Sequence, residues 1–249
     1  MSAVLQVENV TVRFGGVTAV DGVSLSIGEG DLLGFVGPNG AGKTTLMRAI
    51  TGIVRPQAGR VVLEGRSLDG MSIDQRIRCG LALAQQIVQP LRNMTLLDNV
   101  ALACGGARTR NPLAAMFSFD RTAERARARA LLARVGLGDV ADAEPRTLPL
   151  GQLKRLEVAR AMALKPKLLL LDEPLAGLNQ AEAGALADLV RTLNDEGQSI
   201  LLIEHNLREV MRICPVVYAQ DNGRPLAFGK AAEVMKDPDF RAAYLGGGA

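Results

Sequence analysis

The feature that most constrains this 249-residue chain is the segment GPNGAGKTT at residues 37–45. It has the spacing G-x-x-x-x-G-K-[ST], follows an apolar segment at residues 32–36 that is typical of a buried strand, and precedes a helical segment at residues 44–50. In this context the loop holds phosphate groups, because its glycines let successive backbone N–H groups point inward and the helix N-terminus adds partial positive charge. A glycine-rich turn that matches by chance is the alternative, and the flanking strand and helix weigh against it.

We therefore predict that the chain binds a nucleoside triphosphate with this loop. Lys43 can reach the β- and γ-phosphates as a point charge, and Thr44 offers its hydroxyl to Mg²⁺, a hard cation that prefers oxygen ligands. The residues predicted to surround the nucleotide are Gly37, Pro38, Asn39, Gly40, Ala41, Gly42, Lys43, Thr44 and Thr45.

The composition argues against several other classes of function. Aromatic residues make up 3% of the chain, without Trp, and the formal net charge is +3, so we expect neither a base-stacking surface nor a strongly polyanion-binding one. Cys79, Cys104 and Cys214 lack the spacing of a metal site or a disulfide framework and favour a reducing cytosol. No signal peptide or membrane-spanning apolar run is recognisable, so at a membrane we expect the chain to dock onto another protein.

The hydrophobic pattern predicts an α/β fold. Alternating apolar residues between residues 4 and 30 indicate antiparallel strands, the apolar runs at residues 167–171 and 200–203 indicate strands buried on both faces, and residues 221–223 mark a hairpin. Strands that alternate with helices around the phosphate-binding loop imply a mostly parallel sheet with helices on its faces.

We predict a single domain, residues 1–249, with a P-loop NTPase (RecA-like) core, an N-terminal antiparallel β subdomain and an α-helical subdomain inserted at about residues 94–162. Within the helical part, the arginines of residues 121–135 could form a nucleic-acid patch, but a solvated helix face is the favoured interpretation. Residues 105–118 are interpreted as either a loop or a broken helical insertion.

Polar residues follow the two buried strands, at the sheet edge where ligands bind. Asp172 is suited to holding Mg²⁺ and Glu173 to polarising an attacking water, whereas the alternative is a polar pair that caps the strand. His205, the only histidine, could donate to a γ-phosphate, although a lone histidine is more often a structural hydrogen-bonding residue. A neutral amide at Gln85 or Gln86 could order water and Mg²⁺, and spacing does not choose between them.

Together these motifs resemble those of the ATP-binding subunits of ABC transporters, over essentially the whole chain. GPNGAGKT resembles the family's Walker A motif, LLLLDEP at residues 168–174 its Walker B motif with Glu173 as the catalytic glutamate, and His205 in LLIEHNL its switch histidine. Phe14 resembles the aromatic residue that stacks on adenine, and Gln86, by its distance from the helical region, resembles the Q-loop glutamine. The resemblance implies that ATP and Mg²⁺ are bound, with Thr44, Gln86 and Asp172 around the metal.

The family's signature motif has a counterpart at residues 148–152. The residues that the resemblance assigns to contact with the ATP of a second subunit are Leu148, Pro149, Leu150, Gly151 and Gln152. The usual serine is replaced by Pro149, which offers neither a hydroxyl nor an N–H. We hypothesise that this half-site hydrolyses ATP slowly or relies on backbone and helix-terminus contacts.

Finer features resemble the branch that serves uptake of branched-chain and related hydrophobic amino acids. They are AGLN at residues 176–179, where Asn179 lies in the D-loop, and the ending RAAYLGG. The resemblance implies two ATPase subunits, identical or paralogous, that sandwich two ATP molecules. They would drive integral membrane permease subunits at the cytoplasmic face of the plasma (inner) membrane, supplied by a periplasmic or extracellular solute-binding protein.

Several alternatives stay open. Lipopolysaccharide-export ATPases and the ATPases of urea, amide or aromatic-compound importers share much of the pattern. A non-transport ABC ATPase that acts on DNA or ribosomes is disfavoured by the single cassette and the nearly balanced charge, so nucleic acid is not an expected partner. A scaffold that binds ATP without turnover is disfavoured by the joint presence of Glu173, Gln86 and His205, while Pro149 keeps it open.

Overall fold

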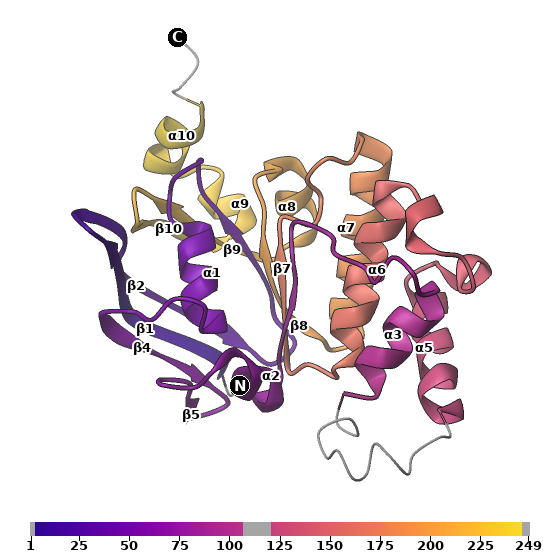
Figure 1. Ribbon diagram of the computed structural model, residues 1–249. Helices are drawn as coiled ribbons and strands as arrows, with labels where there is room; N and C mark the ends of the chain where they lie inside the picture. Colours follow the sequence, from indigo (N-terminus) through magenta and orange to yellow (C-terminus); the bar gives the residue numbers. More distant parts are fainter. Residues whose placement is uncertain (1–2, 107–120, 246–249) are drawn as a thin grey trace.

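The computed structural model describes residues 3–106 and 121–245 and has a layered α/β architecture (Figure 1). An antiparallel sheet lies at one side, a larger sheet lies in the middle, and most of the helices lie beyond it. The antiparallel sheet has four strands, in the spatial order β2 (Val17–Gly28), β1 (Ala3–Phe14), β4 (Ala58–Leu63) and β5 (Arg66–Ser67).

The central sheet is parallel except at one edge, where the hairpin predicted around residues 221–223 adds an antiparallel strand. Its spatial order is β10 (Arg224–Lys230), β9 (Val216–Asp221), β3 (Leu32–Val36), β8 (Ser199–Ile203), β7 (Leu168–Asp172) and β6 (Leu81–Ala84). Parallel neighbours need crossover connections, so helices alternate with these strands along the chain. The mostly parallel sheet and the antiparallel sheet before it confirm the predicted fold class.

The helices lie on both sides of the central sheet. Their bounds are α1 (Lys43–Thr51), α2 (Ile73–Cys79), α3 (Leu96–Cys104), α5 (Thr122–Arg134), α6 (Leu150–Ala163), α7 (Gln180–Asp195), α8 (Leu207–Ile213), α9 (Ala231–Val234) and α10 (Pro238–Leu245). Two 3₁₀ turns, Gly138–Val140 and Pro145–Thr147, join α5 to α6. Within the two described ranges, no helix combines the length and apolar character that crossing a bilayer requires.

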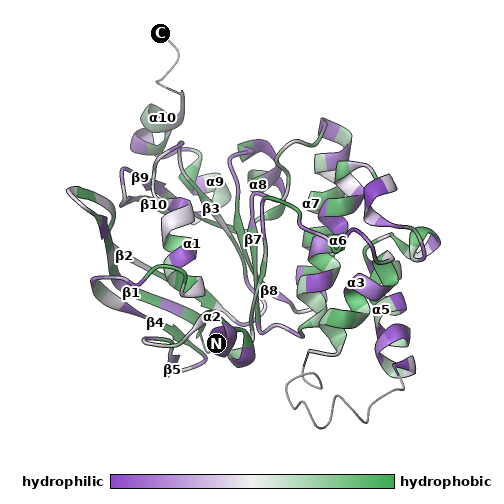
Figure 2. Cartoon of the chain, in the orientation of Figure 1, coloured by the Kyte–Doolittle hydropathy of each residue, from purple (hydrophilic) through white to green (hydrophobic). Residues whose placement is uncertain are grey.

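The central sheet is buried on both faces by two separate cores. In β3, Leu33 and Phe35 pack with α1 and the antiparallel sheet, whereas Leu32 and Val36 pack with the helices on the other face. The leucines of β7 alternate between the same two cores, as do the apolar residues of β8. Figure 2 shows these strands as an apolar zone through the middle of the molecule. Such strands are apolar without alternation, which is why each was predicted to within one residue at either end.

The arginine-rich helix α5 is held by contacts within the chain. Arg125 forms an ion pair with Asp98 of α3, and Arg127 donates to the carbonyl oxygen of Ala163, at the end of α6, at 2.7 Å. These arginines therefore hold the helical part together, which fits a helix face better than a nucleic-acid patch. The segment interpreted as a loop or a broken helix lies outside the described residues from residue 107 onward.

A buried cation caps the far end of α1, the helix that follows the phosphate-binding loop. The guanidinium of Arg76, from α2, donates to the carbonyl oxygens of Ala49 and Ile50, each at 2.8 Å, and to that of Met71 at 3.3 Å. Carbonyl groups in the last turn of a helix lack intrahelical partners, and a cation there also interacts favourably with the helix dipole. Arg76 therefore fixes the end of α1 that lies opposite the loop.

We expect Arg76→Leu to lower the free energy of unfolding by about 2–4 kcal/mol, because it removes the side-chain donor of the Ile50 carbonyl oxygen, leaves that of Ala49 with only the Gly52 N–H, and removes the charge at the helix end. Chemical denaturation measures this loss. Arg78→Leu in the same helix is the matched control, since Arg78 pairs with Asp74 at the surface and such a pair contributes about 0–1 kcal/mol. An equal loss of stability in the two variants would contradict the capping role.

Candidate functional site

The loop at residues 37–45 joins β3 to α1 in a conformation that requires glycine at two points. A Cβ atom at Gly37 would come within 2.4 Å of the Gln220 carbonyl oxygen, and one at Gly42 within 2.1 Å of the Ala19 carbonyl oxygen. Gly42 also has a φ of 97°, in the left-handed region that other residues rarely adopt. The loop is therefore clamped between β2 and β9, at the N-terminus of α1.

Lys43, the first residue of α1, folds its side chain back over this loop. Its Nζ donates to the carbonyl oxygens of Gly37 at 2.6 Å and Pro38 at 3.0 Å. Burial lowers the pKa of Lys43, and nearby carboxylates, Glu173 foremost, oppose that shift. The amine thus lies at the centre of the loop, with the exposed Thr44 beside it in the first helical turn.

Asp172 and Glu173 lie where β7 ends. Glu173 has a φ of 46°, which is uncommon for a residue with a side chain, and its N–H donates to the carbonyl oxygen of Ile203 at 2.9 Å. The chain is therefore turned sharply at this point and attached to the end of β8. Burial, together with the neighbouring Glu173 charge, raises the pKa of Asp172.

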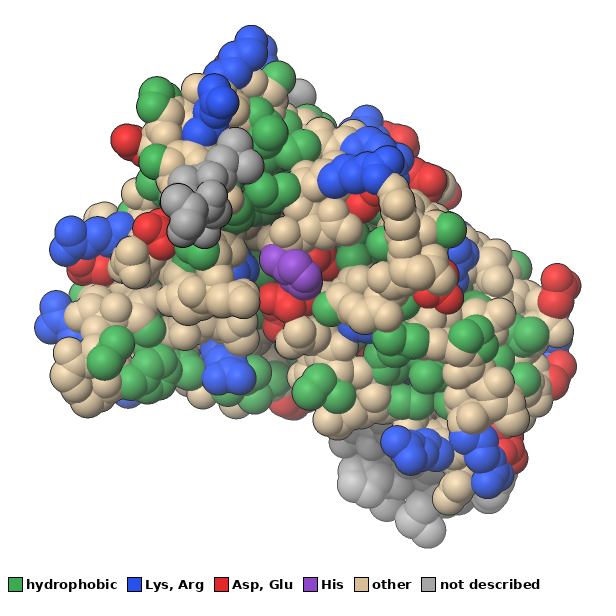
Figure 3. All heavy atoms as spheres, turned by 90° about the horizontal axis from the view of Figure 1, so that it is seen from above, with side chains coloured by type: hydrophobic (Ala, Val, Ile, Leu, Met, Phe, Trp, Pro, Cys, Tyr) green, Lys and Arg blue, Asp and Glu red, His purple; other side chains and the backbone are tan. Residues whose placement is uncertain are grey.

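Gln86, Glu173 and His205 converge from three separate segments. The Gln86 Nε2 donates to the Glu173 Oε2 at 2.7 Å. The His205 Nδ1 lies 3.8 Å from that same oxygen and 3.8 Å from the Oε2 of Glu204. Seen from above, His205 is the purple side chain near the centre of this face, beside acidic side chains (Figure 3). Of the two candidate glutamines, it is Gln86 whose side chain reaches Glu173.

The signature-like segment begins α6, which packs on the opposite face of the central sheet from α1. Pro149 is the N-cap residue, without a side-chain capping bond, and Leu150 is 41% exposed. Leu150 lies against the D-loop, since a Cβ atom at Gly177 would come within 3.0 Å of it. Asn179 caps α7, where its side chain accepts from the N–H of Glu182 at 3.0 Å. Within one chain, this segment therefore lies beside the D-loop rather than beside the phosphate-binding loop.

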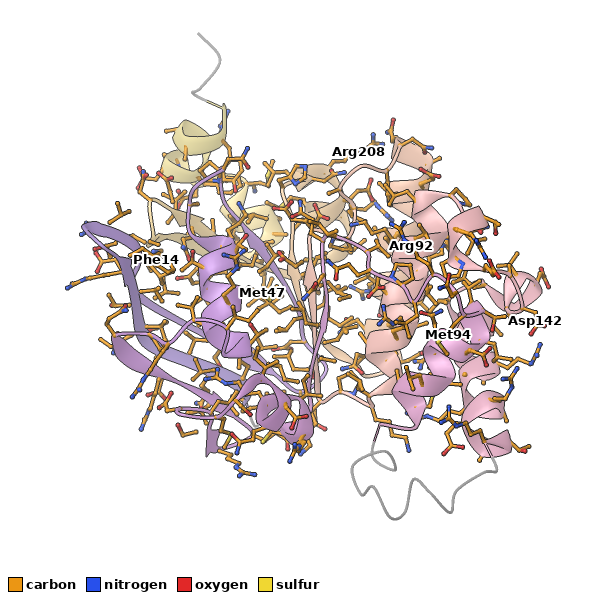
Figure 4. The ribbon with its side chains drawn as sticks, viewed as in Figure 1. Phe14, Met47, Arg92, Met94, Asp142 and Arg208 are labelled. Atoms are coloured by element: carbon orange, nitrogen blue, oxygen red, sulfur yellow. The ribbon has the colours of Figure 1, made fainter. Side chains whose placement is uncertain are left out.

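Phe14 ends β1 on the side of the molecule that carries the antiparallel sheet (Figure 4). Its ring is half exposed, and the residue pairs with Val17 across the β1–β2 turn. Among the residues of the described ranges, Phe14 makes no stacking contact with another ring. About half of the Phe14 surface is thus open to a ligand.

Glu204 is not among the residues predicted from the sequence, yet its carboxylate is fully buried at the site. Its Oε1 accepts from the N–H of Leu175 at 2.7 Å, and its Oε2 accepts from those of His205 at 3.1 Å and Asn206 at 3.4 Å. Burial raises the pKa of Glu204, and these N–H groups oppose the shift. The carboxylate thereby attaches the segment after Glu173 to the segment that carries His205. The available signal was a charged residue at the end of an apolar strand, next to the only histidine.

Two further buried polar side chains border the site and were also not predicted. Gln220, in β9, donates through its Nε2 to the Ala41 carbonyl oxygen of the phosphate-binding loop at 2.6 Å. Lys154, in α6, donates through its Nζ to the Gln86 carbonyl oxygen at 2.5 Å. Their partners lie 179 and 68 residues away along the chain, so no local pattern could indicate these contacts.

The site thus combines a clamped phosphate-binding loop with two carboxylates, a glutamine and a histidine at the ends of parallel strands. This combination defines a P-loop nucleotide hydrolase cassette. A family model described as ABC transporter matches residues 20–176. The chain therefore belongs to the ABC transporter family, and it is an ATPase cassette of that family.

Individual relatives agree with this assignment. The chain is 38% identical over 248 residues, 97% of each chain, to the high-affinity branched-chain amino acid transport ATP-binding protein LivG of Salmonella typhimurium. It is 33% identical to the lipopolysaccharide export system ATP-binding protein LptB of Acidithiobacillus ferridurans, over 99% of this chain and 98% of that one. The ADP conformation of MJ1267, an ATP-binding cassette of an ABC transporter, matches with a TM-score of 0.87 and 31% identity over 99% of this chain and 100% of that one. These likenesses confirm the predicted family and fold class.

We expect Asp172→Asn to make the ligand-free protein more stable near neutral pH. Burial and the Glu173 charge hold the pKa of Asp172 in the folded protein above its value in the unfolded chain. The ionised carboxylate therefore destabilises the fold. This loss of stability develops as pH rises from the unfolded pKa through the folded pKa. Each kcal/mol gained in the free energy of unfolding should raise the melting temperature by about 2–4 °C in a domain of this size.

Thermal melts over a pH series measure the effect, which should shrink as the solution is acidified. Asp188→Asn is the control, because Asp188 is exposed and paired with Arg212 at the surface. A melting temperature that falls at neutral pH in Asp172→Asn would contradict the expectation.

Proposed function

We propose that the chain is the ATP-hydrolysing subunit of an importer for branched-chain or related hydrophobic amino acids. The observation that carries the hydrolytic part is the contact of Gln86 with Glu173 beside His205, at the strand ends that the phosphate-binding loop also borders. The description of the relative at 38% identity supports the class of solute.

The geometry supports a division of work among these residues. Lys43, which donates to carbonyl oxygens of its own loop, would turn to the β- and γ-phosphate oxygens, while the N–H groups of residues 37–45 and the N-terminus of α1 would hold the remaining phosphate oxygens. Phe14 would stack on the adenine ring. Glu173 would polarise the attacking water and His205 would donate a hydrogen bond to the γ-phosphate.

The oxygen donors beside the loop fit Mg²⁺. The Thr44 hydroxyl, the Asp172 carboxylate and the Gln86 Oε1, which is left over when Nε2 donates to Glu173, are hard oxygen ligands of the kind that Mg²⁺ prefers. Across the described ranges, no group of three or more His, Cys, Asp or Glu side chains could hold a metal ion. Phosphate oxygens of the nucleotide and water would therefore complete the coordination, and the ion would neutralise charge on the β- and γ-phosphates.

Each ATP would need residues from a second subunit. Pro149 and Leu150 are exposed at the start of α6, on the opposite face of the central sheet from α1, so residues 148–152 and Asn179 would face the ATP bound by a partner ATPase subunit. The closing and opening of this pair would drive integral membrane permease subunits from the cytoplasmic face of the plasma membrane. A periplasmic or extracellular solute-binding protein would deliver the amino acid, and nucleic acid has no part in this scheme.

The ATPase of a lipopolysaccharide-type exporter is a second candidate, because a relative with that description is 33% identical to this chain. The 38% identity to the amino-acid relative and the presence of Asn179 in the D-loop favour the importer. Importers of urea, amides or aromatic compounds would use the same site and differ only in subunits that contact the solute.

Glu173→Gln should lower ATP turnover by at least about 10²-fold with little change in ATP affinity, because it removes the base and leaves the phosphate-binding loop intact. Phosphate release and binding of a fluorescent ATP analogue measure the two quantities. In the host, deletion of the gene should abolish uptake of labelled leucine, isoleucine and valine, and wild type but not Glu173→Gln should restore it. Unchanged turnover would refute the role of Glu173, and unchanged uptake with altered surface lipopolysaccharide would favour the exporter.

Pro149→Ser should raise turnover in the assembled transporter, by roughly several-fold, because serine supplies both an N–H and a hydroxyl at the N-cap position of α6. Pro149→Ala is the matched control, since it restores the N–H without the hydroxyl. Steady-state turnover at saturating Mg-ATP separates the two contributions. Wild-type activity in both variants would show that Pro149 does not limit hydrolysis.

A further inference from the structure

Lys154 lies where three segments with separate roles meet. Its side chain is almost fully buried and projects from the second turn of α6, just after the signature-like segment. Its Nζ donates to the carbonyl oxygen of Gln86 at 2.5 Å and to that of Glu173 at 3.4 Å. One ammonium group thus joins α6 to two of the three segments that carry the side chains proposed for catalysis, those of Gln86 and Glu173.

These contacts are with the main chain. Burial lowers the pKa of Lys154, and the carboxylates of Glu204, Glu173 and Asp172 oppose that shift. The three carboxylates therefore favour the charged ammonium, while its hydrogen bonds go to backbone oxygens. Hydrogen bonds from a charged donor are stronger than those between neutral groups. The two hydrogen bonds from Lys154 therefore fix the path of the backbone at Gln86 and at Glu173.

A second cation of α6 contacts the same loop. The Arg160 Nη1 donates to the carbonyl oxygen of Gln89 at 3.0 Å and also pairs with Glu157 of its own helix. The segment from Gln86 to Gln89 is therefore attached to α6 at two carbonyl oxygens. Because α6 is a single packed helix, a displacement of its N-terminal end is passed to this segment.

We propose that Lys154 is a positioning residue that couples the two ATP sites of the assembled pair. The inference rests on the proposed function, in which the start of α6 meets the ATP held by a second subunit. A shift of that end of α6 moves Lys154, and with it the main chain at Gln86 and Glu173 in the first subunit's own site. ATP bound at one site thereby changes the catalytic geometry of the other site. The two sites are then linked by a coupling free energy.

The test compares full-length wild type with Lys154→Met, Lys154→Arg and Arg155→Met. Arg155 is the matched control, because it is the next cation of α6 and donates to a backbone oxygen, that of Val135, within the helical part. We expect Lys154→Met to lower kcat about tenfold or more with a change in ATP affinity below about twofold, and to lower the Hill coefficient for ATP towards 1. Lys154→Arg should retain cooperativity, and Arg155→Met should lose only thermal stability.

Amide hydrogen exchange without nucleotide supplies a second readout that needs no turnover. Peptides covering residues 85–91 should exchange faster in Lys154→Met and at the wild-type rate in Arg155→Met. The inference is overturned if exchange in that segment is unchanged in Lys154→Met, or if Arg155→Met lowers the Hill coefficient equally. A wild-type chain that did not hydrolyse ATP would refute the proposed function instead, and the exchange comparison would still decide whether Lys154 holds the Gln86 segment.

Discussion

Burial of the central sheet on both faces is the constraint on which the rest of the structure depends. Two separate cores cover β3, β7 and β8, so ionised side chains can lie only where these strands end. Asp172 and Glu204 occupy two of those ends, and the burial that raises the pKa of each comes from the same apolar layers. The electrostatics of the site are thus a result of how the sheet is packed.

Local signals were sufficient for the fold and for the phosphate-binding loop. A strand covered on both faces is apolar throughout, whatever its neighbours are, so β7 and β8 could be located from composition over five residues. The loop was equally visible, because Gly37, Gly42 and Lys43 stand at a spacing that the loop itself dictates. Both features depend on residues that are close in the sequence.

Contacts between distant segments account for what could not be predicted. Lys154 lies in a helix with several basic residues, and nothing in the local sequence distinguishes a buried lysine from a surface one. The fold buries it against the carbonyl oxygen of Gln86, which is 68 residues away. Glu204 and Gln220 are polar residues at the ends of core strands, and their partners, Leu175 and Ala41, lie in the loops that follow the neighbouring strands β7 and β3, so these contacts become apparent only when the sheet is assembled. The choice of Gln86 over Gln85 was made on the family resemblance rather than on the chemistry of the two residues, and the contact that distinguishes them, the hydrogen bond from Gln86 to Glu173, again joins distant segments.

The clamp on the phosphate-binding loop has a consequence for how the sequence can change over time. A Cβ atom added to Gly37 or Gly42 would collide with the carbonyl oxygen of Gln220 or Ala19. Every amino acid carries such a backbone oxygen. The residue at position 19 can therefore be exchanged without reshaping the loop, provided that β2 keeps its course, whereas neither glycine can acquire a side chain. Mutational tolerance in this part of the chain is thus distributed unevenly: it is wide at position 19 of the supporting strand β2 and absent at Gly37 and Gly42 of the loop that the strand supports.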